Sequence, residues 1–439
     1  MRFGIFCLII IFVSIFETVN ALGYQFTFTP QITVSEEYTD NLFNSESNEK
    51  DDLITTISPR FSAELSGKYG GAELSYAPGA VFYDKYTEYN TWRHNVALTG
   101  WKEIARNTRL EFRDSFMRTE DPDGMGEDIV DGDGDEEPLI EADRTVRKGR
   151  EPYYTNAAGL TLSHQFGADD SVYLGYLYGI LRNEDPEEED NDRHTLSTGI
   201  AYRFTPHIGI DTNVSYTRGL FSGDSDDTDE WQGSIRLTRS FSRNFDGFVQ
   251  YAHTYFDYKG DDEDYQVYDS SVGIDYVFSE DAHLSLSLGY FIQDREVSED
   301  ETGLSLNGVL GKTWTFRRGS INLTGSTGYD SAEFGAENLG FTIYQQAGCR
   351  SEYGFTRQLR GNIYGSYRRD KYVNTEDDRK DRTRNLGAGL TFQPERWVAL
   401  RLDYSYSVID STENENDSRE NRVFLSVTLS LSRPFRVVY

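Results

Sequence analysis

The sequence has little cysteine, little methionine and few long apolar runs. It contains 2 cysteines and 3 methionines in 439 residues. Cys7 lies in the apolar N-terminal segment, so the rest of the chain keeps only Cys349 and forms no internal disulfide. After that segment, no stretch is long and apolar enough for a transmembrane helix. If the chain spans a membrane, it must do so as a closed barrel, which also satisfies every backbone hydrogen bond in lipid.

Basic residues are also scarce. The chain has 43 Lys and Arg against 74 Asp and Glu, which gives a formal net charge of −31. Proteins bind nucleic acids by displacing counterions with lysine and arginine, so this balance excludes DNA and RNA as expected partners. It favours solvated acidic loops and loosely bound divalent cations.

Patterns for catalysis and metal binding are missing as well. The six histidines (His94, His164, His194, His207, His253 and His283) show no metal-ligand spacing. No local motif indicates an enzyme at a barrel rim, so we expect neither catalysis nor a cofactor. Asp131, Asp133 and Asp135 have calcium-loop spacing, but Glu136 and Ala142 stand where a calcium hand needs Gly and Glu. They remain weak calcium candidates in a solvated acidic loop.

The N-terminus has the composition of a secretory signal peptide. Arg2 supplies a positive charge, an apolar run follows over 3–16, and Val19-Asn20-Ala21 offers small residues for cleavage. We therefore predict a signal peptide over 1–21 and a mature chain over 22–439. The alternative is an uncleaved anchor, for which the apolar run is short.

What the sequence does have is aromatic residues and a two-residue alternation. Phe, Trp and Tyr make up 14% of the chain. Apolar residues recur at every second position, with small or polar residues between them, as in Leu284, Leu286, Leu288, Tyr290 and Ile292. A strand sorts such residues onto two faces, whereas a helix would scatter them. The pattern repeats along the chain and predicts an all-β protein.

The connections between these segments alternate in length. Short ones such as 206–207 and 317–319 lie between longer acidic ones such as 183–192 and 375–381. Short periplasmic turns alternating with longer extracellular loops are typical of outer-membrane proteins. The sequence predicts a single closed antiparallel transmembrane β-barrel of about 20 strands, between about 18 and 22. The longest loop, 119–150, is acidic and could fold inward to constrict the lumen.

The C-terminus resembles the sorting signal that the barrel-insertion machinery reads. Apolar residues alternate from Val423 and continue through Phe435, Val437 and Tyr439, with a break at Arg433-Pro434. The rival is a secreted soluble β-sandwich or propeller, whose apolar faces would meet in a dry core. The Tyr-rich apolar faces and the alternating loops argue against it.

The other face of the predicted strands carries mixed charges that would line the lumen. These candidates are Arg113, Arg203, Asp211, Arg236, Asp246, Arg360, Arg368, Arg401 and Asp403. Such residues could steer an anionic or polyhydroxylated solute, and the arginines suggest a mildly anion-tolerant pore. The alternative is that opposite charges only pair across strands in a wet lumen.

The first mature strand contains Tyr38-Thr39-Asp40-Asn41, and Ser58-Pro59 follows in the next strand. These motifs resemble the opening of the outer-membrane β-barrel porins associated with exopolysaccharide, capsule and exosortase gene clusters. The resemblance implies a porin that moves or anchors a surface polysaccharide, with periplasmic export proteins as partners.

These observations lead to one expected function and three alternatives. The expected function is an outer-membrane porin that exports exopolysaccharide or capsule through a hydrated lumen, in contact with lipid and lipopolysaccharide. The alternatives are a diffusion porin for small solutes, a closed barrel acting as scaffold or adhesin, and a rim enzyme.

Overall fold

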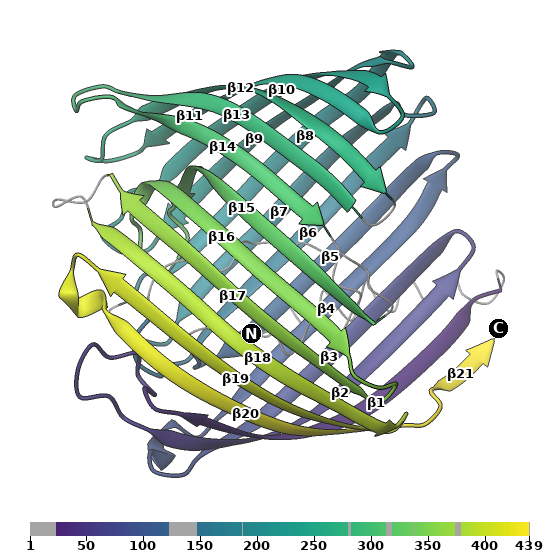
Figure 1. The fold of residues 1–439 in the computed structure, drawn as a ribbon, viewed down its shortest axis with the longest axis vertical. Helices are drawn as coiled ribbons and strands as arrows, with labels where there is room; N and C mark the ends of the chain where they lie inside the picture. The colour runs from purple at the N-terminus through teal and green to yellow at the C-terminus, as the bar shows by residue number, and fades with distance from the viewer. Residues whose placement is uncertain are drawn as a thin grey trace.

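The computed structural model describes residues 23–122, 147–186, 188–279, 282–312, 318–335, 337–373 and 379–438. It consists of one 21-stranded sheet in which sequence neighbours pair antiparallel (Figure 1). Two short 3-10 turns, η2 (Thr87–Tyr89) and η4 (Asn414–Asn416), lie in connections. The strands are β1 (Gln25–Thr39), β2 (Asp52–Gly67), β3 (Gly70–Tyr83), β4 (Thr91–Ala105), β5 (Thr108–Thr119), β6 (Tyr153–Gln165), β7 (Ser171–Asn183), β8 (Asn191–Thr205), β9 (Ile208–Phe221), β10 (Thr228–Ser242), β11 (Phe245–Tyr258), β12 (Tyr265–Ser279), β13 (Ala282–Arg295), β14 (Glu301–Lys312), β15 (Gly319–Ala332), β16 (Gly340–Gly354), β17 (Leu359–Tyr372), β18 (Lys380–Glu395), β19 (Val398–Ser411), β20 (Ser418–Ser430) and β21 (Phe435–Val438).

The first and last strands close the sheet into a barrel. Residues 31–39 of β1 pair with residues 422–430 of β20, and residues 25–28 pair with 435–438 of β21. Strands β20 and β21 therefore share one position, and the closed barrel has 20 strands. The break between them falls at Arg433-Pro434, because proline has no N–H to donate to the ladder. This confirms the predicted fold class.

The outward face of the barrel is apolar. Exposed large apolar residues occupy alternate positions of many strands, for example Leu286, Leu288 and Tyr290 in β13. Phe291, at an intervening position, is 0% exposed and packs inside. A continuous exposed apolar wall of this size fits the hydrocarbon core of a membrane. Among the described residues, no helix is long and apolar enough to cross a membrane.

The two ends of the barrel differ in their connections. Turns such as 106–107 and 206–207 lie at one end, and connections such as 40–51 and 259–264 lie at the other. Aromatic residues flank the apolar wall at both ends: Trp92 and Trp231 near the long loops, Phe204 and Phe241 near the short turns. Short turns mark the periplasmic end of such barrels, so the long loops are extracellular.

One seam interrupts the regular wall. Strands β14 and β15 pair through only Leu306, Asn307 and Gly308, and the two strands diverge beyond that point (Figure 1). There Phe341 and Ile343 of β16 pack against Phe256 of β11 and Phe291 of β13. The extracellular end of the β15–β16 hairpin therefore lies inside the curve of β11–β13.

Candidate functional site

The charged residues proposed to line the lumen alternate along their strands with the exposed apolar residues of the outer wall. Ion pairs join several of these side chains to neighbours on the same face. They are Arg203–Asp211 at 3.2 Å, Arg368–Asp370 at 2.7 Å, Arg401–Asp403 at 2.6 Å, and Arg236–Asp275. Ion pairs within a strand and between strands thus account for many of the charges, which leaves fewer of them available to a permeating ion.

Three of the predicted residues stand apart from these pairs. Arg113, Arg360 and Asp246 have no ion-pair partner within the described part of the chain. Arg113 borders a cavity of about 200 Å³ in the inner wall of β2–β5, which Glu64, Glu73 and Trp101 also line. These other lining residues were not predicted from the sequence, because Trp101 and the two glutamates belong to no recognisable motif.

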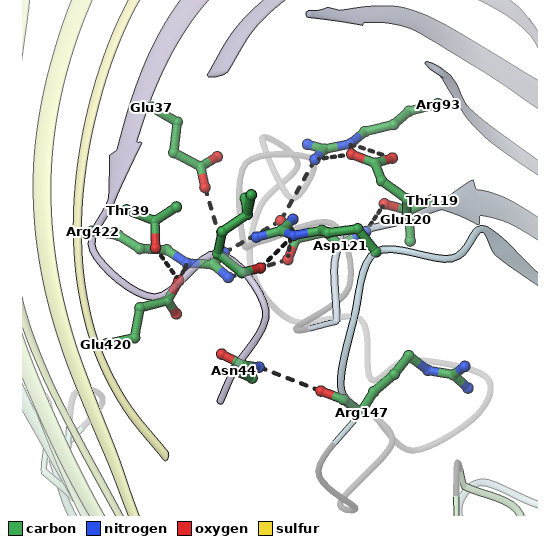
Figure 2. A network of polar contacts seen from close by, with 12 residues as sticks. Glu37, Thr39, Asn44, Arg93, Thr119, Glu120, Asp121, Arg147, Glu420 and Arg422 are labelled. Atoms are coloured by element: carbon green, nitrogen blue, oxygen red, sulfur yellow. Dashed lines mark hydrogen bonds and ion pairs between the residues drawn. The ribbon is translucent and has the colours of Figure 1, made fainter. Parts of the chain in front are cut away.

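A dense polar network lies inside the extracellular mouth, where the β5–β6 connection begins and ends. Its centre is the carboxylate of Asp121, which faces three arginines from different segments (Figure 2). The ion pairs measure 3.2 Å to Arg422, 3.4 Å to Arg150 and 3.7 Å to Arg93. Burial alone would raise the pKa of Asp121, but the three guanidinium groups hold that pKa well below its ordinary value.

The residues around Asp121 tie this connection to the barrel wall. Arg93 of β4 pairs with Glu120 at 2.6 Å, and Arg150 donates from Nε to the carbonyl of Leu42 at 2.7 Å. Arg422 of β20 also pairs with Glu420 at 2.6 Å. The two ends of the long connection are therefore fixed inside the lumen, against β4, β20 and the segment that follows β1 (Figure 2). No sequence signal could identify this network, because its members come from separate segments and Arg422 lies 301 positions from Asp121.

The tip of the β15–β16 hairpin crosses the mouth from another side. The Tyr258 hydroxyl donates a hydrogen bond of 2.6 Å to Glu333, at the base of the tip. Phe334 stacks on Phe221 of β9, with ring centroids 5.6 Å apart. The amide of Asn338 donates to Glu189, in the β7–β8 connection, at 3.0 Å.

Two of the carboxyl groups at this tip have shifted pKa values. Burial raises the pKa of Glu333 to about 7, against a lowering effect of the Tyr258 hydroxyl. Burial also raises the pKa of Glu337, although Arg379 pairs with this carboxylate at 3.0 Å. The ends of the β5–β6 connection and the β15–β16 tip both narrow the mouth. The carboxyl group that anchors the tip, Glu333, has a pKa near neutral pH.

Several predicted features lie outside the described residues. These are the signal peptide over 1–21, the calcium candidates Asp131, Asp133 and Asp135, and the terminal Tyr439. Phe435 and Val437 are exposed on β21, and the Phe435 ring stacks on Phe28 of β1 with centroids 6.3 Å apart. In the part of the chain that the structure describes, no group of three or more His, Cys, Asp or Glu residues could hold a metal ion.

Solved porin structures align with most of the chain at low sequence identity. A BenF-like porin from Pseudomonas fluorescens Pf-5 is 14% identical, covers 92% of this chain and 99% of its own, and has a TM-score of 0.44. OccK3 (OpdO) of Pseudomonas aeruginosa is 15% identical, with 92% and 96% coverage and a TM-score of 0.44. OpdK of Pseudomonas aeruginosa, solved with vanillate, is 11% identical, with 92% and 99% coverage and a TM-score of 0.44. Similarities this weak support no argument about substrate.

No curated protein matches the chain. A family model does match it, over residues 20–145 and 299–431, which together make up more than half of the sequence. The matched segments include the strands that close the barrel and those around the seam. The chain belongs to the family described as "Putative beta-barrel porin 2" and is an outer-membrane β-barrel porin.

Proposed function

We propose that this porin conducts small solutes passively through a hydrated lumen that is narrowed at its extracellular mouth. The observation that carries the proposal is the inward position of two segments, the ends of the β5–β6 connection and the β15–β16 tip. Both are held by buried polar contacts, centred on Asp121 and on the Glu333–Tyr258 pair. A mouth of this kind selects solutes by size and by charge.

Export of a surface polysaccharide is the second candidate, and it rests on the resemblance of the first two strands to polysaccharide-associated porins. Asp40 and Asn41 of that motif bind to β20, where Asn41 donates to the carbonyl of Arg419 at 2.9 Å. These contacts explain the motif as part of barrel closure. The motif therefore gives no support to one substrate over another.

Liposome swelling tests the size limit directly. Liposomes that contain the protein should swell in monosaccharides and amino acids and should not swell in oligosaccharides of increasing length. Replacing the tip residues 334–338 by a short Gly-Ser turn should raise the size limit and the single-channel conductance. Equal permeability to long oligosaccharides before and after this change would contradict the proposal.

A gene deletion separates the two candidates. Under the diffusion proposal, cells that lack the protein should keep their surface polysaccharide and lose uptake of small solutes. Loss of the surface polymer, with retention of the polymer in the periplasm, would favour export. Export of the protein itself through a signal peptide over 1–21 stays a prediction, which N-terminal sequencing of the mature protein would test.

A further inference from the structure

The outer wall carries an arginine cluster at the extracellular ends of β17–β20. Its members are the outward-facing, exposed side chains of Arg369, Arg382, Arg384 and Arg419. Arg369 and Arg382 are direct cross-strand partners, and Arg384 and Arg419 both pair across strands with Val408. The four side chains thus occupy two adjacent rows on one patch of the wall.

Too few acidic groups on the patch balance these charges. Asp410 pairs with Arg384 at 2.9 Å. The side chains of Arg369, Arg382 and Arg419 have no ion-pair partner among the described residues. Like charges directly opposite each other destabilise a sheet, so an anion bound between Arg369 and Arg382 would stabilise this pair. The excess is unusual in a protein whose formal net charge is −31.

The other outward arginines near this end of the barrel are paired. Arg118 pairs with Glu184 at 2.6 Å, Arg182 pairs with Asp192, and Arg218 pairs with Asp229 at 3.5 Å. The β17–β20 cluster is therefore a local feature of the wall. It is not part of a uniform ring of unpaired arginines around the extracellular rim.

The height of the cluster on the wall identifies the anion. Directly below the arginines on β17 and β18 lie the exposed apolar side chains of Ile363, Leu386 and Leu390. Apolar residues of this kind mark the hydrocarbon layer, so the arginines stand at the level of the lipid headgroups. Guanidinium groups bind phosphate oxygens in a bidentate manner, and basic clusters at this level recognise anionic headgroups.

We propose that Arg369, Arg382, Arg384 and Arg419 form a binding site for the lipid A phosphates of one lipopolysaccharide molecule. The contact is direct, guanidinium to phosphate. It differs from bridging by divalent cations between acidic loops and lipopolysaccharide. The site lies outside the lumen and is independent of the solute that the porin conducts.

The test is native mass spectrometry of the detergent-solubilised full-length protein with bisphosphorylated lipid A, in the presence of EDTA. Wild-type protein should retain the lipid, and lipid A without phosphates should not bind. Each Arg→Gln change should weaken binding about fivefold, and the fourfold variant should lose it. Arg382→Lys with Arg384→Lys should bind at an intermediate level, because lysine keeps the charge but loses the bidentate geometry.

Arg239→Gln is the matched control. Arg239 is an exposed arginine of β10 near the periplasmic end, and its loss should leave binding unchanged. Heat-modifiable mobility in SDS gels would verify that every variant is folded. Equal lipid retention by the fourfold variant and the wild type would overturn the proposal. Binding that requires Mg²⁺ and disappears in EDTA would overturn it too, in favour of cation bridging.

Discussion

Asp40, just beyond the end of the first strand, accepts two hydrogen bonds from Asn421 of β20. The backbone N–H and the side-chain amide of Asn421 each donate to the carboxylate, both at 2.7 Å. The two residues are 381 positions apart, and their contact joins the first strand to the last at the extracellular end. Asn421 also accepts a hydrogen bond of 2.8 Å from the Tyr404 hydroxyl. This single pair therefore links three strands at the point where the barrel closes.

We expect Asn421→Ala to weaken this closure. The change removes the amide donor to a carboxylate and the acceptor of the Tyr404 hydroxyl, which should lower the free energy of unfolding by about 1–3 kcal/mol. Thermal and urea unfolding in detergent micelles would measure the loss. Asn244→Ala, in a short periplasmic turn, is the control and should have little effect. Equal stability of the two variants would show that the Asp40 contact is not needed for closure.

Asp121→Asn should release the ends of the β5–β6 connection into the lumen. Three arginines would lose their shared buried counter-charge, and breaking such a buried pair costs about 3–5 kcal/mol locally. Single-channel recordings should then show more frequent current fluctuations than the wild type. Asp51→Asn, which removes an exposed pair with Lys85, should leave the recordings unchanged. Current fluctuations as rare in Asp121→Asn as in the wild type would refute the tethering role of Asp121.

Acidification should narrow the mouth, because it protonates Glu333 at the base of the β15–β16 tip. Its pKa is raised from 4.5 to about 7 by burial, with added repulsion from Asp262 and Glu230. The proton is therefore bound more tightly in the packed hairpin than in an unfolded chain. The stability that protonated Glu333 contributes to the packed hairpin is fully present below about pH 4.5. This contribution is lost as the pH rises through about 7.

Conductance should accordingly be lower at pH 5 than at pH 8. Glu333→Gln mimics the protonated carboxyl, so it should give low conductance at both pH values. Glu352→Gln, an exposed position on β16, should keep the wild-type pH dependence. A Glu333→Gln channel that still responds to pH would assign the effect to another group.

Arg113 and Arg360 should carry most of any anion tolerance of the lumen. The other arginines predicted to line it, Arg203, Arg236, Arg368 and Arg401, are paired with carboxylates. Replacing both Arg113 and Arg360 by Gln should shift the reversal potential in a KCl gradient towards cation preference. Arg239→Gln, on the outer wall, is the control for a change of net charge alone. A strong cation preference in the wild type would rule out an anion-tolerant pore.

The sequence alone determined the barrel, its approximate size and its orientation. These properties depend on local patterns: alternation along each strand, turn length and the position of apolar residues such as Leu286 and Leu288. A strand has only two faces, so the register of apolar residues decides which face meets lipid. The same alternation placed Arg203 and Asp211 on one inward face, where they form an ion pair.

Only the tertiary structure decided how the mouth is narrowed and where the outer wall concentrates charge. Phe341 follows the same alternation as lipid-facing residues, yet the seam between β14 and β15 lets it pack inside against Phe291. Asp121 meets Arg422 only because closure brings the ends of the chain together, at a separation of 301 positions. Alternation specifies a side of a strand, but contacts across the lumen depend on how all the strands curve and close, and no local pattern encodes that.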